Sequence, residues 1–146
     1  MMRGDYGWWT TIGTRWADCD AYGQVNNVIY YSWFDTGVTR MLYERGVLGD
    51  GASAIGLGLE SACQFQAPVE FPGDVEVGVA IGRLGTKSAR YEVGVFPPGH
   101  EEPAATRHVT HVCVDRATRR PAATEPCHRD ALADLIRAEI TPGDTR

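Results

Sequence analysis

The feature that most constrains the fold is one long helical pattern, because the other segments of the chain mostly have the pattern of strands. Between residues 27 and 45, apolar positions recur at steps of three and four, which gives a helix one broad apolar face. Asn26 and Asn27 can cap the start of this helix, and Gly46 can end it. Gly37 lies on the apolar face and is tolerable there if another backbone packs close. The apolar positions are Tyr30, Phe34, Val38, Met41 and Leu42.

Segments with the pattern of strands precede and follow this helix in the sequence. The spacing predicts strands over residues 8–16, 62–70, 75–81, 89–96 and 106–114, with a glycine-rich connection over 49–60 and a short helix over 131–136. The links between the later strands have hairpin length, which favours antiparallel pairing. A single α+β domain, with an antiparallel sheet around one long helix, is the economical two-layer arrangement.

Composition narrows the functional classes. A chain of 146 residues fits one domain, and a net charge of -5 without a Lys/Arg block argues against nucleic acid as the main partner. No apolar run is long enough to span a membrane, and the start MMRGDYGWW lacks a signal-peptide core. The four cysteines, at 19, 63, 113 and 127, lack metal-ligand spacing and are typical of reduced thiols, so we expect a cytoplasmic protein. His108 and His111 are three apart in a strand and point to opposite faces, which makes a poor metal pair.

The segment RWADCDAYGQVNNVIYYSWF, residues 15–34, carries the strongest chemical signal. Asp18 and Asp20 end an apolar-aromatic run, Gly23 marks a turn, and a helix starts at once. The free N–H groups and the dipole of a helix start favour negative charge. A carboxylate beside such a site suits acyl transfer, in which one group attacks or activates water and N–H groups hold the oxyanion.

These residues resemble the signature of hotdog-fold acyl-CoA thioesterases of the 4-hydroxybenzoyl-CoA thioesterase type. That signature is an aromatic-rich strand, Asp-x-Asp, a glycine turn, His-Val-Asn-Asn and a helix tyrosine. The resemblance covers roughly residues 9–140, within a single hotdog domain spanning 1–146. Gln24 departs from the usual histidine, which puts substrate preference in question more than catalysis. The matching positions are Asp18, Asp20, Gly23, Val25, Asn26, Asn27 and Tyr30.

The resemblance implies a thioester hydrolase that uses no metal or redox cofactor and acts on an acyl-CoA. It implies a homodimer or homotetramer, with two sheets joined edge to edge and active sites at the interface. Asp20 would be the nucleophile or general base, and the backbone N–H of Asn27 would polarise the thioester carbonyl. Gly23, Val25, Asn26 and Tyr30 would line the substrate site.

Further contacts are suggested by position alone. Glu60 and Ser61 could face the same pocket, although a polar edge on a loop explains them equally well. A cluster around a predicted turn, formed by Arg83, Lys87, Ser88 and Arg90, could hold the phosphates of coenzyme A, although exposed turns carry such charges routinely.

Structural roles compete with these assignments. Asp20 could simply cap its own turn, and we expect Asp18 to be structural or solvent-facing. Tyr30, Tyr31, Trp33 and Phe34 should fill the core rather than stack on an acyl group. Two alternative functions also remain. One is a non-catalytic acyl-CoA-binding module, against which the retained Asp20 argues; the other is a hotdog enoyl-thioester hydratase, which would need a histidine near Asp20.

Overall fold

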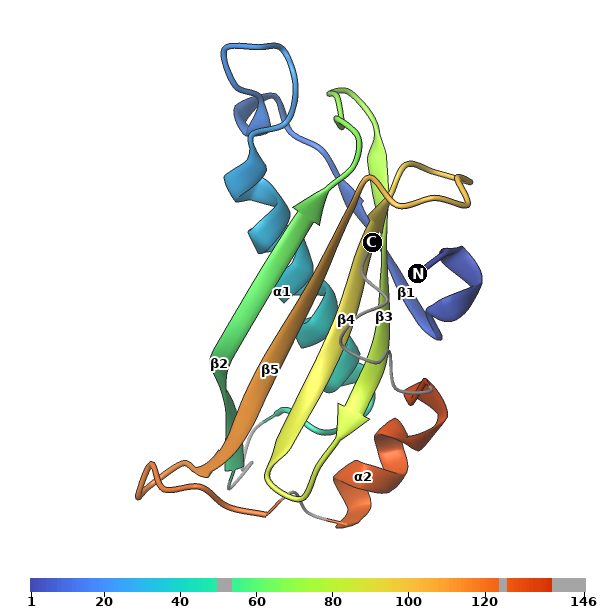
Figure 1. The fold of residues 1–146 in the computed structure, drawn as a ribbon. Coiled ribbons are helices and arrows are strands. Elements are labelled where there is room, and N and C mark those ends of the chain that lie inside the picture. Colours follow the sequence, from blue (N-terminus) through green and yellow to red (C-terminus); the bar gives the residue numbers. More distant parts are fainter. Residues whose placement is uncertain (50–53, 124–125, 138–146) are drawn as a thin grey trace.

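The computed structural model describes residues 1–49, 54–123 and 126–137 (Figure 1). Five antiparallel strands form one sheet in the spatial order β1-β3-β4-β5-β2. A long helix, α1, follows β1 in the chain, and a short helix, α2, follows β5. The elements are β1 (Trp8–Gly13), α1 (Asn27–Glu44), β2 (Ala54–Phe65), β3 (Asp74–Leu84), β4 (Ser88–Phe96), β5 (Ala105–Asp115) and α2 (Pro126–Leu132).

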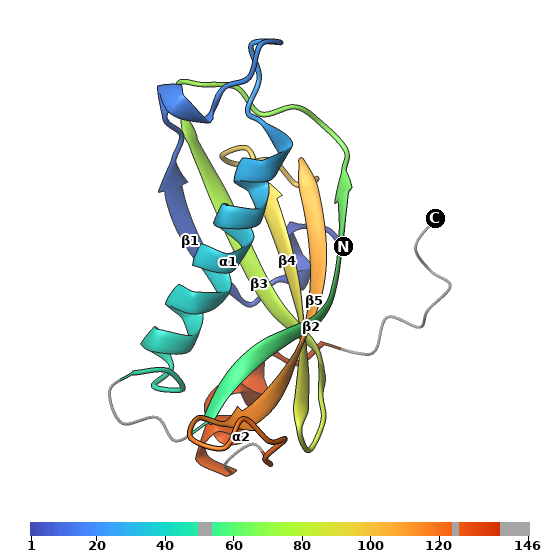
Figure 2. The same cartoon turned by 90° about the vertical axis from the view of Figure 1, so that its left-hand side faces the viewer.

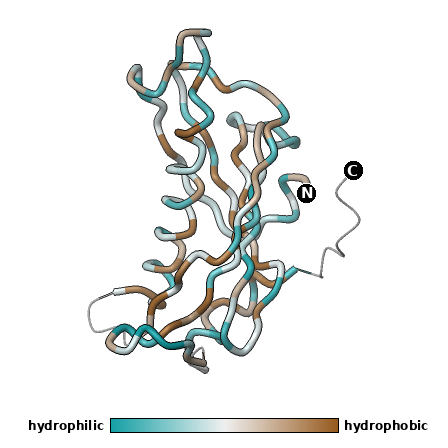
Figure 3. The backbone as a smooth tube through the Cα atoms, turned by 60° about the vertical axis from the view of Figure 1, so that its left-hand side comes forward, coloured by the Kyte–Doolittle hydropathy of each residue, from teal (hydrophilic) through white to brown (hydrophobic). Residues whose placement is uncertain are grey.

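The helix α1 lies across one face of the sheet (Figure 2). Apolar and polar residues alternate along it (Figure 3), and its buried side chains pack on the inward residues of β3 and β4. Gly37 makes the closest approach, because a Cβ there would lie 2.7 Å from Cγ1 of Val77. The glycine therefore serves contact with a sheet side chain rather than with another backbone. The buried residues of α1 are Tyr30, Trp33, Phe34, Gly37, Val38, Met41 and Leu42.

The opposite face of the sheet carries a smaller aromatic cluster. The rings of Tyr6, Trp9 and Phe96 pack edge to face, with centroids 5.1–5.9 Å apart. Gly78 and Gly94, which are paired across β3 and β4, leave the space that the Tyr6 side chain occupies. The N-terminal segment thus covers only part of this face.

Three predicted elements have the wrong boundaries. β1 ends at Gly13 rather than at 16, because Trp16–Asp18 forms a 3₁₀ turn. β2 begins at Ala54, inside the segment predicted to be a connection, and ends at Phe65. Its glycines hide any alternation, and backbone pairing with β5 holds it in the sheet. The last helix begins at Pro126 and continues into a 3₁₀ turn over Ala133–Leu135.

The strand β2 forms one edge of the sheet and is exposed along most of its length. Within the described residues it pairs only with β5, so the other side of its backbone faces outward. Leu57, Leu59 and Phe65 are exposed on it at 40%, 71% and 46%. A long, apolar, unpaired edge is a ready template for pairing with another chain.

No helix in the described part of the chain has the length and apolar character needed to cross a membrane.

Candidate active site

The loop between β1 and α1 folds back on itself at the helix start. Cys19 and Val25 form an antiparallel bridge, the N–H of Asp20 donates to the carbonyl of Gln24 at 2.9 Å, and the N–H of Asn26 donates to the carbonyl of Asp18 at 2.8 Å. Residues 18–20 therefore run alongside residues 24–26, immediately before the first turn of α1. The two ends of this loop therefore lie side by side at the start of α1.

The two aspartates of this loop have different roles. Asp18 is only 1% exposed, and its carboxylate accepts hydrogen bonds from the guanidinium and the backbone N–H of Arg15. It is structural and not solvent-facing. Asp20 is half-buried, and its Oδ1 accepts the N–H of Tyr22 at 2.8 Å. The turn-capping role considered for Asp20 is thus present, but it engages only one oxygen of the carboxylate.

The helix start leaves one donor available. The side chain of Asn26 accepts the N–H of Val28 at 3.0 Å, and its carbonyl accepts the N–H of Ile29 at 2.9 Å. None of the hydrogen bonds within the described chain uses the N–H of Asn27, which is exposed. This N–H has the position and freedom that an oxyanion donor needs.

The other motif positions shape this end of the fold. Gly23 has a φ of +78°, a backbone conformation that favours glycine, and Val25 is buried. Tyr30 is buried against Trp33 and Phe65, with ring centroids 5.1 and 5.2 Å away, and burial raises the pKa of its hydroxyl. Of the four aromatic residues expected in the core, Tyr31 alone is substantially exposed.

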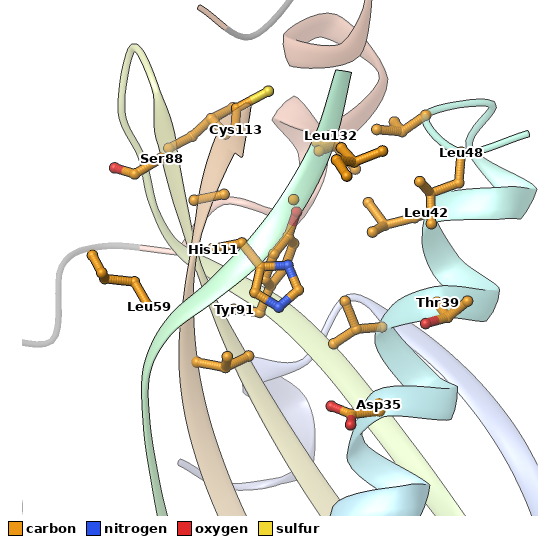
Figure 4. Close-up of a pocket in the computed structure, with 18 of the residues that line it drawn as sticks. Asp35, Thr39, Leu42, Leu48, Leu59, Ser88, Tyr91, His111, Cys113 and Leu132 are labelled. Atoms are coloured by element: carbon orange, nitrogen blue, oxygen red, sulfur yellow. The ribbon is translucent and has the colours of Figure 1, made fainter. Parts of the chain in front are cut away.

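A pocket of about 650 Å³ lies between the second half of α1 and strands β2, β4 and β5 (Figure 4). Apolar side chains make up much of its lining, and His111 and Tyr91 stand on the sheet side. The two rings meet edge to face with centroids 5.2 Å apart. Burial lowers the pKa of His111 and raises that of Tyr91 to about 12, so both are neutral at pH 7. Apolar side chains in the lining include Val38, Leu42, Leu48, Leu84, Val109 and Leu132.

Arg107 closes one side of this pocket by joining α1 to the edge strand. Its guanidinium donates to the carboxylate of Asp35 at 2.6 Å and to the hydroxyl of Ser61 at 2.7 Å. It also stacks over the ring of Tyr31, 5.2 Å from the centroid. Glu60 and Ser61 both line this pocket, whose lining includes neither Asp20 nor Asn27, so that they share a site with Asp20 stays a prediction. Glu60 lies 3.7 Å from the imidazole of His108.

The suggested phosphate cluster lies elsewhere. Arg83 and Lys87 are exposed at the hairpin between β3 and β4, at the opposite end of the sheet from the helix start (Figure 1). Ser88 lines the pocket, and Arg90 is paired with Glu92 at 2.7 Å on the other face. Within one chain, this hairpin and Asp20 are therefore not brought together.

The cysteines in the described part of the chain are not linked to one another. Cys19, Cys63 and Cys113 form no disulfide with one another, and burial raises the pKa of Cys63 to about 11. A thiol with such a raised pKa is a poor nucleophile. The side chain of Cys127 lies outside the described residues.

Comparison with known proteins connects this geometry to a family. The sequence profile of the thioesterase-like superfamily matches residues 14–132, which includes the loop, the helix start and the pocket. The chain belongs to the thioesterase-like superfamily. This membership confirms the resemblance seen in the sequence, the hotdog fold and the enzyme class, a thioester hydrolase.

Solved structures resemble this thioesterase-like protein closely. The PA5185 protein of Pseudomonas aeruginosa is 44% identical, with a TM-score of 0.88 over 94% of this chain and 97% of that one. The PA2801 protein of the same organism, a putative thioesterase, is 28% identical, with a TM-score of 0.78 over 84% and 95%. A gentisyl-coenzyme A thioesterase is 24% identical, with a TM-score of 0.75 over 85% and 98%, and shows the fold alone. None of the curated proteins matches the sequence.

Sequence reasoning missed the polar wall of the pocket in this thioesterase-like protein. His111 was considered only for metal binding, and Arg107, Asp35 and Tyr91 were not singled out. One signal was available, since residues 105, 107, 109, 111 and 113 share a face of the strand and Val109 marks that face as inward. The partners on α1 and β2 are distant in sequence, so only the fold shows the cluster.

Proposed function

We propose that this protein hydrolyses the thioester of an acyl-CoA, with Asp20 as nucleophile or general base and the N–H of Asn27 as oxyanion donor. The observation that most supports this proposal is the fold of the loop. It places Asp20 beside residues 24–26, directly before Asn27, whose N–H takes part in none of the hydrogen bonds among the described residues. The carboxylate retains one oxygen without a protein hydrogen bond within the described residues, and that oxygen can attack the carbonyl or take a proton from water.

We also propose that the active unit is a homodimer joined through β2. The edge of β2 is long, apolar and unpaired within the described chain, which is the surface that strand pairing would cover. Antiparallel pairing of two such edges would reverse one sheet against the other. The hairpin that carries Arg83 and Lys87 in one subunit would then point toward the end of the partner that carries its catalytic loop. On this arrangement the phosphates of coenzyme A contact the subunit that does not supply the carboxylate.

The structure also supports acyl-CoA as the substrate class. The apolar pocket beyond Asp35 offers room for an acyl group, and a tethered apolar chain gains about 0.8 kcal/mol for each buried methylene. A solved relative in this fold, the SAV2348 protein of Staphylococcus aureus, was determined in complex with CoA; at 17% identity it indicates only that this fold accommodates that carrier.

The test is release of thiol from short, long and aromatic acyl-CoAs by the wild type and by Asp20→Asn. We expect hydrolysis of at least one thioester and a loss of at least a hundredfold in kcat for the variant, with an unchanged melting temperature. Asparagine can still accept the N–H of Tyr22, so the loop should hold its shape.

Three other results would contradict this proposal in different ways. Binding of acyl-CoA without hydrolysis by the wild type would identify a binding module. Hydration of an enoyl-CoA in place of hydrolysis would identify a hydratase. Activity that survives in Asp20→Asn would leave the enzyme class and remove Asp20 from the site.

A further inference from the structure

The pocket wall carries an imidazole, that of His111, which accepts and donates no hydrogen bond among the described residues. His111 is half-buried on β5 and contacts Tyr91 through the ring edge. Across the described residues, no backbone or side-chain group hydrogen-bonds its ring nitrogens. Figure 4 shows the ring in the middle of the pocket, between Tyr91 and α1. An unpaired polar group facing a cavity is available to whatever fills the cavity.

A glycine on the neighbouring strand, Gly56, makes room for this ring. Gly58 pairs with His111 across β2 and β5, and a Cβ at Gly56 would lie 3.0 Å from Nδ1 of His111. A side chain at position 56 would therefore press against the imidazole. The irregular register between Gly58 and Glu60 also turns the strand at this point. The local sequence keeps the polar edge of the ring open to the pocket.

The charges around the ring decide what it can bind. Asp35 and Arg107 are the charged groups whose fields reach His111, and they neutralise one another in an ion pair of 2.6 Å. Burial keeps the imidazole neutral at pH 7. A neutral imidazole offers one donor and one acceptor, and a hydroxyl group complements both. Beside the ring itself, neither Asp35 nor Arg107 is left unpaired for a carboxylate or an ammonium group.

The position of the ring sets where such a hydroxyl must lie. Asp35 is eight residues along α1 from Asn27, about 12 Å at a rise of 1.5 Å per residue. The pocket therefore lies well beyond the helix start at which the thioester would be held, and a group that reaches His111 is remote from the thioester.

We propose that this pocket binds an acyl chain that ends in a hydroxyl group, and that His111 is the specificity residue that recognises the hydroxyl. The proposal rests on the proposed function, because it assumes that the pocket holds the acyl part of the substrate. It narrows the substrate class from acyl-CoA in general to acyl-CoA with a polar end.

The test measures binding to two thioethers that cannot be hydrolysed, octyl-CoA and 8-hydroxyoctyl-CoA, by calorimetry. For each protein, the Kd for octyl-CoA is divided by the Kd for 8-hydroxyoctyl-CoA. We expect this ratio to fall about threefold to tenfold in His111→Phe, the effect of one neutral hydrogen bond. His111→Gln, which keeps a donor and an acceptor, should retain more of the ratio than His111→Phe.

His108→Phe is the matched control, because it changes the same residue type on the opposite face of the same strand. Its ratio should equal that of the wild type. An equal ratio in the wild type and His111→Phe, or no binding of either thioether, would overturn the proposal. Because the thioethers report binding alone, a protein that binds them as expected and hydrolyses no thioester would contradict only the proposed function.

Discussion

The carboxylate of Asp18 accepts three hydrogen bonds from Arg15, at 2.8 Å from the backbone N–H and at 3.0 and 2.7 Å from the guanidinium. The pair closes the 3₁₀ turn that follows β1 and fixes the point from which the loop of Asp20 departs. The second aspartate, two residues later, makes one hydrogen bond within its own loop. Asp18 thus has a structural role, and Asp20 is the candidate for a chemical role.

We expect Asp18→Asn to lower the free energy of unfolding by about 1–3 kcal/mol, since it weakens a buried, charge-assisted network. Urea denaturation measures the change. Asp20→Asn is the control, because its carboxylate makes a single hydrogen bond that asparagine can replace, and its stability should stay within about 0.5 kcal/mol of the wild type. Equal losses of stability in the two variants would contradict the division of roles.

Substitution by proline tests the backbone donor directly. Asn27 is the first residue of α1, where proline is well tolerated, and Asn26 already has the extended φ and ψ of -62° and 136° that a residue before proline prefers. Asn27→Pro should therefore fold normally while it removes the N–H, and we expect kcat to fall about 10²–10³-fold.

The matched control is Asn27→Ala, which keeps the N–H and should keep kcat within a few-fold of the wild type. Thiol release and circular dichroism measure the two properties. Full activity in Asn27→Pro would exclude this N–H as the oxyanion donor.

Gly37→Ala tests the packing of α1 on the sheet. Alanine favours a helix by about 1 kcal/mol over glycine, but its Cβ would lie 2.7 Å from Cγ1 of the fully buried Val77. Because overpacking a core costs about 1–3 kcal/mol, we expect a net loss of stability in urea denaturation. The double variant Gly37→Ala/Val77→Ala, compared with Val77→Ala alone, should show a gain from the same alanine. A gain in the single variant would show that the helix can move away.

His111 should make stability depend on pH. Burial lowers its pKa below the ordinary 6.5, so the unfolded chain takes up a proton at a higher pH than the folded chain. Stability is therefore lost as the pH falls from 6.5 through the lower pKa of the folded state. We expect the decrease in unfolding free energy between pH 7.5 and 5.5 to be smaller in His111→Phe than in the wild type. A profile in His111→Phe that is identical to that of the wild type would contradict the prediction.

The edge of β2 should control assembly. Leu57→Lys/Leu59→Lys places two charges on the exposed edge strand, and charged edges oppose strand pairing. By analytical ultracentrifugation we expect a wild-type dimer and a monomeric double variant with reduced thioesterase activity. Thr11→Lys, at an exposed residue of β1, the strand at the opposite edge of the sheet, should remain dimeric. A dimer that survives in the double variant would place the interface elsewhere.

Local chemistry explains why α1 was predicted so accurately. The side chain of Asn26 caps the first turn and Gly46 has a φ of +73°, so both ends are encoded by the residues at the ends. The apolar spacing between them follows directly from contact with one sheet. The predicted end at 45 differs by one residue from Glu44.

The parts that were missed depend on distant partners. β2 begins at Ala54 because β5 supplies hydrogen bonds along its length, while Gly56 and Gly58 show no strand pattern of their own. Asp18 was expected to be either structural or exposed, and only the 3₁₀ turn with Arg15 decides between the two. The pocket brings together α1, β2, β4 and β5, so the pattern of β5 alone could mark the face of His111 as inward but could not show the pocket that it lines.

The contacts of Arg107 have a thermodynamic consequence. One guanidinium holds the helix through Asp35, holds the edge strand through Ser61 and forms a side of the pocket. If two copies associate through β2, as proposed above, a ligand that displaces this guanidinium would shift the edge strand and change the free energy of that association. Linkage is reciprocal, so association must change the affinity for that ligand by the same factor. The affinity of this protein for its acyl group would then vary with the concentration of the protein itself.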